Sequence, residues 1–156
     1  MRVCRPTCAS RGDTSKFERS RVMAAVKSVD TRPEMIVRKL VYSLGYRYRL
    51  HVRSLPGCPD MVLASRRKII NVHGCFWHRH RCKAGRSHPA SRRAHWVAKF
   101  SRNQQRDREV GRALRKAGWQ VLTVWECQFR DPEKMRGKLA AFLAGRRRGR
   151  GISIGS

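Results

Sequence analysis

Apolar residues recur along the chain at two different spacings, and the spacing predicts where helices and strands lie. Downstream of Thr31 an apolar stripe with helical spacing ends at Gly45, and Thr31 with Glu34 has the spacing of a helix-capping box. Three short β-like runs follow at 46–51, 61–64 and 68–73, separated by turn-rich segments. We expect these connected strands to form an antiparallel meander. The helical stripe consists of Ile36, Val37, Leu40, Val41 and Leu44.

The second half of the chain predicts two more helices with a strand between them. A helix after Pro89 is expected to end at Gly118, residues 119–125 (WQVLTVW) have the pattern of a buried strand, and Asp131-Pro132 is typical of a helix start. The order helix, three strands, helix, strand, helix indicates an α/β fold with a mixed central sheet flanked by helices. The stripe of the long helix consists of Trp96, Phe100, Val110, Leu114 and Ala117, and that of the last helix of Leu139, Phe142 and Leu143.

Length and composition indicate one domain with irregular ends. The chain has 156 residues, of which 40% are hydrophobic, enough for a single modest core. Residues 1–15 and 145–156 lack periodicity and are rich in charge, so we expect a disordered basic arm and a disordered basic tail around a domain at 16–144.

Charge narrows the class of partner. The chain carries 37 Lys and Arg against 10 Asp and Glu, a formal net charge of +27, and the basic residues also lie inside the predicted elements. A folded surface that binds nucleic acid explains this balance best, with a merely solvated basic surface as the alternative. There is no run of about 18 apolar residues to span a bilayer and no secretory signal, so we expect no membrane and a cytoplasmic location.

An aspartate and a histidine mark the first candidate chemical group. Asp60 opens the second strand and His73 ends the third, so the two can meet across neighbouring strands. This geometry resembles the PD-(D/E)xK nuclease core of restriction endonucleases, in which an aspartate and a second oxygen hold Mg²⁺ and the last triplet residue assists the attacking water. Here the triplet is Asn71-Val72-His73, poor in carboxylates, and a histidine at a strand end is more often structural.

The segment 73–82 (HGCFWHRHRC) contains candidate ligands for a second metal. Thiols and imidazoles at this spacing suit zinc, and Cys127 at the end of the fourth strand can close a tetrahedral site. A closed four-ligand site would be structural and coupled to folding. In a reducing compartment a metal site is also more plausible than a disulfide. The expected ligands are Cys75, His80, Cys82 and Cys127.

His73 and His78 then remain for catalysis, and Asp107 is their expected partner. A carboxylate on an apolar helical stripe is costly unless it is paired, and an imidazole would serve as that partner. A His78–Asp107 pair would orient the ring as a general base or acid. The simpler alternative is an Asp107 paired with one of the many arginines. Glu34 is also ambiguous, because its capping role explains its position although it could face the metal site.

With these residues in view, residues 13–145 resemble the very-short-patch repair (Vsr) endonucleases. The resemblance rests on SRVMAAVKSVDTRPE, LPGCPD, VHGCFWHRHRC, RDREVGRALRKAGW and VLTVWEC, together with the spaced Trp96 and Asn103. It implies that Asp60 and the backbone carbonyl of Val72 bind the catalytic Mg²⁺, and that His73, His78 and Asp107 serve the chemistry. The family's wedge residues, which open the DNA stack, fall on Phe76, Trp77 and Trp96.

The resemblance also implies a substrate and a product. The substrate is double-stranded DNA with a T:G mismatch left by deamination of 5-methylcytosine, and one strand is nicked 5′ to the thymine, giving 3′-hydroxyl and 5′-phosphate ends. We expect a monomer in the bacterial nucleoid, with general mismatch-repair proteins as further candidate partners. Two departures from the family pattern are Val72, often Thr in relatives, and Cys58, where a basic or polar residue is more usual.

Two other functions compete with this one. A related nicking or homing-type endonuclease would share the metal core and recognise another lesion or sequence. A non-catalytic zinc-stabilised nucleic-acid-binding protein would keep the cysteines without needing Asp60, His73, His78 and Asp107 together. Their joint presence favours the enzyme.

Overall fold

A mixed four-stranded sheet organises the part of the chain that the computed structural model describes, residues 30–89 and 93–145. The chain divides into the units Met1–Thr31 and Arg32–Ser156, and the sheet belongs to the second. The strands lie side by side in chain order, β1 (Arg49–Leu50), β2 (Met61–Leu63), β3 (Lys68–His73) and β4 (Gln120–Trp125). The first three strands form the antiparallel meander that the sequence predicted, and β4 runs parallel to β3.

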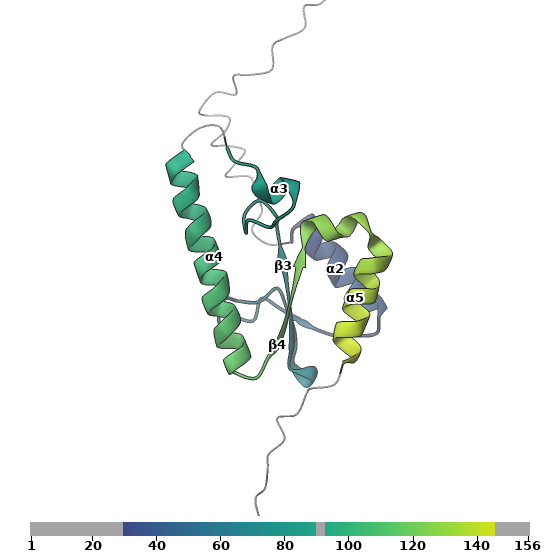
Figure 1. Cartoon of the computed structure of the whole chain (residues 1–156). Coiled ribbons are helices and arrows are strands. Elements are labelled where there is room, and N and C mark those ends of the chain that lie inside the picture. Colours follow the sequence, from purple (N-terminus) through teal and green to yellow (C-terminus); the bar gives the residue numbers. More distant parts are fainter. Residues whose placement is uncertain (1–29, 90–92, 146–156) are drawn as a thin grey trace, which may run out of the picture. The chain divides into compact units, whose positions relative to one another are not determined.

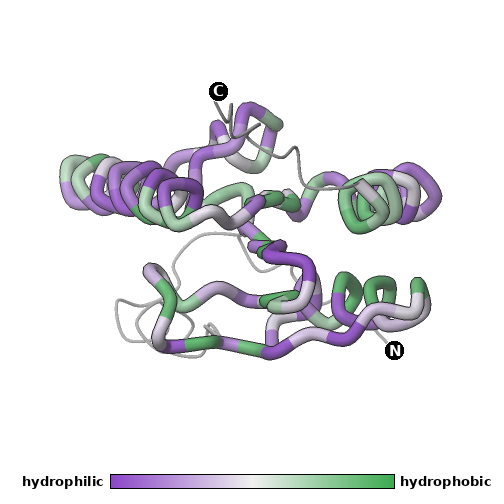
Figure 2. The backbone as a smooth tube through the Cα atoms, turned by 90° about the horizontal axis from the view of Figure 1, so that it is seen from below, coloured by the Kyte–Doolittle hydropathy of each residue, from purple (hydrophilic) through white to green (hydrophobic). Residues whose placement is uncertain are grey.

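Helices cover both faces of this sheet. Helix α4 (Arg93–Lys116) lies on one side of β3 and β4, and α2 (Arg32–Ser43) and α5 (Pro132–Ala144) lie on the other (Figures 1 and 2). The core is accordingly split in two. Val37, Met61, Ile70 and Leu139 belong to the larger cluster, on the side of α2 and α5, and Leu114 of α4 packs with Val62 and Ile69 in the smaller one. The α/β fold with a flanked mixed sheet is confirmed.

Several predicted boundaries and core positions were wrong. The run 46–51 forms only the two-residue β1, both residues of which are exposed, because an edge strand pairs on one side only. Ala64 belongs to the 3₁₀ turn η1 (Ala64–Arg66) and not to a strand. Ile36 is 37% exposed, because α2 faces the sheet through Val37 and Val41 and leaves Ile36 on its outer edge.

The second half also differs in detail from its pattern. Ala117 is exposed and lies beyond the end of α4, where Gly118 adopts a φ of +80° as expected for a helix-ending glycine. In β4 only Val124 is fully buried, so the strand is less buried than its sequence suggests. The short helix α3 (Lys83–Arg86) and the 3₁₀ turn η2 (Glu126–Arg130) were not predicted.

Lys68 anchors the start of β3 to the end of α5. Its side chain is buried, and its Nζ donates hydrogen bonds of 2.5–2.8 Å to the carbonyl oxygens of Phe142, Leu143 and Gly145. These are carbonyls that a helix leaves without an internal partner at its C-terminus. At the other end of α5, the Asp131 carboxylate accepts from the Lys134 amide and caps the first turn, as predicted.

Some predictions concern segments outside the described residues. The arm at 1–15 with Cys4 and Cys8, the family-like motif before residue 30, and the tail beyond Gly145 belong to this group. Among the helices of the described ranges, none is long and apolar enough to cross a membrane.

Candidate functional site

Asp60 sits at the start of β2 and is attached to the neighbouring strand. Its Oδ2 accepts a hydrogen bond of 2.7 Å from the backbone amide of Val72 on β3. Burial raises the pKa of Asp60, the Val72 amide lowers it, and the nearby charge of Glu34 raises it, with a net upward shift. The carboxylate is therefore held in a site that disfavours its charge unless a cation is present.

A buried ion pair on α2 lies beside Asp60. Arg38 Nη2 donates to Glu34 Oε2 at 3.1 Å and lies 3.1 Å from His51 Nε2, and both residues of the pair are buried. An arginine can only donate, so His51 Nε2 is the acceptor in this contact. Glu34, Arg38 and His51 all act electrostatically on Asp60. The first-helix glutamate thus does face the Asp60 region, and Arg38 and His51 join it there.

His73, His78 and Asp107 form a second cluster at the end of β3. The rings of His73 and His78 stack with centroids 3.9 Å apart, and His78 Nδ1 lies 2.5 Å from Asp107 Oδ2 on α4. Ligand atoms of all three residues lie within 4.8 Å of one another. Since Asp107 accepts at Nδ1, the Nε2 of His78 is the ring atom that is left for another group.

Burial and neighbouring charges shift the pKa values of His73 and Asp107. Burial, together with the neighbouring His78, lowers the pKa of His73 to about 4, so this ring is neutral near pH 7. For Asp107 burial alone would raise the pKa, but the hydrogen bond and charge of His78 outweigh it and lower the value overall. The cluster therefore combines a neutral imidazole with an ionised carboxylate that can stabilise a protonated His78.

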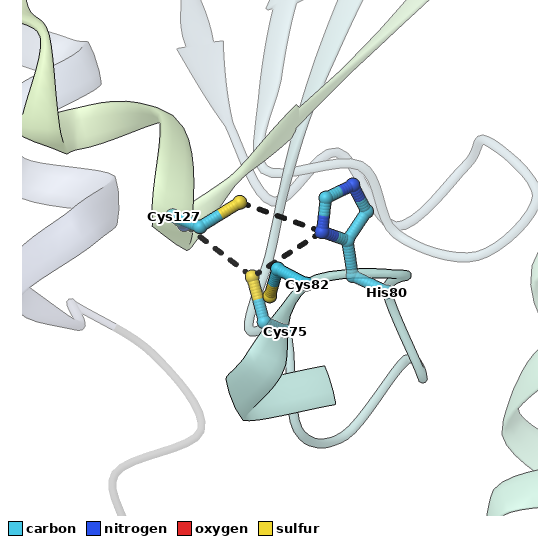
Figure 3. A group of neighbouring side chains, drawn as sticks. All are labelled: Cys75, His80, Cys82 and Cys127. Atoms are coloured by element: carbon cyan, nitrogen blue, oxygen red, sulfur yellow. Dashed lines mark hydrogen bonds between the residues drawn. The ribbon is translucent and has the colours of Figure 1, made fainter. Parts of the chain in front are cut away.

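Three cysteines and a histidine gather where β3 and β4 end (Figure 3). His80 Nδ1 lies 3.4 Å from Cys127 Sγ and 3.9 Å from Cys75 Sγ. Zinc bond lengths of about 2.3 Å to sulfur and 2.0–2.1 Å to nitrogen place such atoms about 3.6 Å apart in a tetrahedral site. The donor set therefore fits zinc in both chemistry and spacing. Its members, Cys75, His80, Cys82 and Cys127, have ligand atoms within 4.8 Å of one another.

The thiols of this cluster differ in environment. Burial raises the pKa of Cys75 to about 12, whereas a hydrogen bond with His80 lowers the pKa of Cys82 to about 6. A buried thiol with so high a pKa ionises only if a cation compensates its charge. A metal bound by all four groups would supply that compensation.

Backbone contacts fix the shape of the loop that carries these ligands. The Cys75 amide donates to Glu126 Oε2, and the Cys127 amide donates to Cys75 Sγ at 3.3 Å. The His80 ring stacks on Trp125 with centroids 4.4 Å apart. Gly85 in α3 approaches the His80 backbone so closely that a Cβ there would overlap the His80 carbonyl oxygen. The loop is thus held by the end of β4 and by η2, both distant from it in sequence, and by α3, which follows it directly.

An aromatic group lies between this loop and α4. Phe76 and Trp77 contact each other and Trp96, and Phe76 also meets Phe100, which is buried. Trp77 and Trp96 are half-buried, and the Lys99 ammonium lies 5.1 and 5.4 Å from their ring centroids. Trp77 and Trp96 therefore combine aromatic surface with a cation at the edge of the site.

Comparison with known proteins decides the family. Residues 13–84 match the family model described as DNA mismatch endonuclease Vsr. A type II nicking enzyme, V.XorIIP of Xanthomonas oryzae pv. oryzae, is 46% identical over 129 residues, which cover 83% of this chain and 94% of that protein. This chain belongs to the Vsr family.

Further Vsr relatives agree with this assignment. The DNA mismatch endonuclease Vsr of Escherichia coli K12 is 41% identical over 120 residues, 77% of this chain and 76% of that protein. The type II nicking enzyme V.NmeAIP of Neisseria meningitidis is 38% identical over 126 residues, 81% and 88% of the two chains. The Vsr assignment therefore rests on most of the length of several relatives.

Within this Vsr chain the predicted catalytic and metal-binding residues fall into three groups, beside the aromatic group of Phe76, Trp77 and Trp96. Asp60 with Val72 and Glu34 forms one, His73 with His78 and Asp107 the second, and the cysteines with His80 the third. Sequence reasoning missed Arg38 and His51, and nothing in the local spacing marks His51. An arginine four residues after Glu34 on the same helix was the available signal for Arg38.

Proposed function

We propose that this chain nicks one strand of duplex DNA 5′ to the thymine of a T:G mismatch, in a Mg²⁺-dependent hydrolysis. The observation that carries the proposal is that Val72 and His73 are consecutive residues. The Val72 amide binds the Asp60 carboxylate, and the next residue, His73, stacks on His78 of the His73–His78–Asp107 cluster. The carboxylate and the cluster therefore contact adjacent residues of β3. A carboxylate for a hard cation beside a set of proton-transfer groups is what phosphodiester hydrolysis requires.

The residues around Asp60 fit a magnesium site. Asp60 and the backbone carbonyl of Val72 would hold the ion, which when bound supplies positive charge to the scissile phosphate. Two features of the chain support this. The pKa of Asp60 is raised by burial, and the amide oxygen of Asn71, next to Val72 on β3, is buried without a hydrogen-bond partner in the described ranges. A fold of the PD-(D/E)xK nuclease type would account for this placement of Asp60 directly before β2 and of the triplet on β3.

The imidazoles serve the proton transfers. Water attacks phosphorus, the bond from phosphorus to the 3′-oxygen breaks, and products with 3′-hydroxyl and 5′-phosphate ends result. His73, neutral near pH 7, can accept the proton of the attacking water. His78, held by Asp107 at Nδ1, can present a proton at Nε2 to the leaving 3′-oxygen.

The aromatic group gives a basis for choosing mismatched DNA. Trp77 and Phe76 lie between the proposed zinc ligands Cys75 and His80, which would hold the two rings in a fixed position, and Trp96 meets them from α4. Opening a base step costs a few kcal/mol and less at a mismatch, so insertion of these rings favours a T:G pair over paired DNA. The names of the relatives support nicking and mismatch recognition, since one is a mismatch endonuclease and others are nicking enzymes.

A nicking assay with a panel of duplexes tests the proposal. Purified protein is incubated with labelled duplexes that carry a single T:G, T:A or C:G pair in varied flanking sequences, with and without added Mg²⁺. We expect one nick, 5′ to the mismatched thymine, only on T:G duplexes and only with Mg²⁺. Nicking of fully paired duplexes at a fixed sequence would instead support a nicking endonuclease of other specificity.

A further inference from the structure

A row of basic residues follows one side of α4 past the candidate site. Lys99, Arg102 and Arg106 are spaced three and four residues apart, so their side chains leave the helix on the same side, one turn after another. Lys99 lies over the rings of Trp77 and Trp96. At the other end of the row, Arg106 precedes Asp107, and its charge acts on both His73 and Asp107. The row therefore leads from the aromatic group to the catalytic cluster.

Arg106 is a cation without a protein partner within the described ranges. Its neighbour Asp107 is engaged by His78, and the structure shows no hydrogen bond or ion pair from the Arg106 guanidinium to those residues. The only other carboxylate of α4, Glu109, accepts from Gln105. By contrast, Arg38, the other arginine acting on this region, donates to the buried Glu34.

Binding of DNA beside the acidic residues of the site requires a compensating positive charge, which Arg106 can supply. Under the proposed function a DNA phosphate approaches the carboxyl groups of Glu34, Asp60 and Asp107, whose negative charge opposes binding of a polyanion. An exposed arginine beside them offers a planar set of donors that matches phosphate oxygens. Arg102, one turn earlier, lies about 6 Å along the helix axis from Arg106.

We propose that Arg106 binds a phosphate next to the bond that is cut and that Arg102 binds a neighbouring phosphate of the same strand, so that this side of α4 forms a phosphate-binding edge. The identity of the cut strand rests on the proposed function. The phosphate contacts themselves rest on the helix geometry and the charges.

The salt dependence of DNA binding measures phosphate contacts directly. Binding of labelled T:G and matched duplexes is followed by fluorescence anisotropy at several salt concentrations, without added Mg²⁺. Each phosphate contact contributes about 0.9 to the slope of log affinity against log salt. We expect Arg106→Gln and Arg102→Gln each to make the slope shallower by about that amount, and Arg106→Lys to restore it.

Arg108→Gln is the matched control. Arg108 is exposed and on the same helix, and it points about 200° around the axis from Arg106. The same charge is lost, but the slope should stay at the wild-type value. An Arg106→Gln slope equal to that of Arg108→Gln would overturn the proposal.

Single-turnover nicking at saturating protein separates this inference from the proposed function. Arg106→Gln should slow nicking about 10- to 100-fold, because a bidentate contact near the reacting phosphate is strengthened as charge develops, and Arg102→Gln should have a smaller effect. If wild-type protein nicks no T:G duplex while the slopes change as expected, the proposed function fails and the phosphate edge stands. Normal nicking by Arg106→Gln with an unchanged slope refutes the edge alone.

Discussion

The Asp60 carboxylate accepts a hydrogen bond of 2.7 Å from the backbone amide of Val72, so the residue before β2 and the next-to-last residue of β3 are fixed relative to each other. Asp60→Asn keeps an oxygen that can accept this hydrogen bond but removes the charge. We expect nicking to fall on the order of 10³-fold or more, because several kcal/mol of metal-dependent transition-state stabilisation are lost. Single-turnover nicking measures the change. Affinity for a T:G duplex should alter less than about threefold, and retained nicking would remove Asp60 from the metal site.

The cysteine cluster is tested by a pair of matched substitutions. Cys127→Ser removes a proposed zinc ligand that would join η2 to the loop after β3, so we expect loss of bound zinc and a melting temperature lower by on the order of 10 °C. Cys58→Ser is the control, since Cys58 is an exposed thiol outside the cluster. Metal analysis and thermal unfolding of both variants provide the measurement. Zinc-free wild-type protein that is folded and active would contradict the site.

The His78–Asp107 contact predicts a dependence on pH. The pKa of Asp107 is lowered from its ordinary value of 3.8, so the native state binds this proton more weakly than the unfolded state. Its stabilisation is present above pH 3.8 and is lost as pH falls through the lower native value. Asp107→Asn should therefore be less stable than wild type at pH 7, and the difference should shrink at an acid pH well below the ordinary pKa of 3.8. Urea unfolding at the two pH values tests this. An unchanged difference would mean that the carboxylate contributes nothing through its charge.

The same substitution should affect activity more than stability. Asparagine cannot stabilise a protonated His78, and it can favour the wrong tautomer of the ring, so nicking should fall about 10²- to 10⁴-fold. Rates from pH 6 to 9 on T:G duplexes provide the measurement. Arg112→Gln on the same helix serves as the control and should nick at the wild-type rate.

Trp77→Ala tests the wedge. Trp77 is half-buried and lies against Trp96 and Lys99, so its ring can be removed with less damage to the core than that of Phe76, which packs on buried Phe100. We expect the preference for T:G over paired duplex to fall by about tenfold or more, in line with the few kcal/mol of unstacking energy. Tyr42→Ala, at an aromatic residue of α2 that is 57% exposed, should leave the preference unchanged. Full discrimination by folded Trp77→Ala would place mismatch recognition elsewhere.

Two glycine substitutions separate a packed position from an open one. Gly85→Ala must displace the His80 carbonyl, so we expect weaker zinc retention in a chelator challenge. Gly137 lies inside α5 with no atom near its would-be Cβ, and Gly137→Ala should raise stability by up to about 1 kcal/mol. Equal zinc retention in the two variants would show that the close approach of Gly85 does not shape the loop.

The sequence predicted the helices, the strands and the grouping of the candidate site residues better than it predicted the packing. Period and capping residues located α2, α4, α5 and the three main strands, because amphipathic patterns and caps are local properties. The grouping of Cys75, His80, Cys82 and Cys127 could be predicted because three of them lie within a span of eight residues after β3 and the fourth follows β4, the parallel neighbour of β3.

What escaped prediction depends on tertiary contacts. Lys68 starts the predicted strand 68–73, and it is buried because the end of α5 supplies carbonyl acceptors from residues more than 70 positions away. His51 looked like the last residue of a strand, and its contact with Arg38 depends on a turn in which its φ is +45°. Neither contact leaves a mark in the local pattern.

Trp77 and His78 both lie on the stretch of chain between Cys75 and His80. Under the proposed roles, Trp77, which distinguishes mismatched from paired DNA, and His78, which assists cleavage, lie on the same loop, and the proposed zinc would hold that loop in place. Loss of the metal, whether through oxidation of a thiol or through scarcity of zinc, would release the loop and abolish mismatch recognition and cleavage together. The damaged protein would then be inactive, and it would not become a non-specific nuclease that cuts intact DNA.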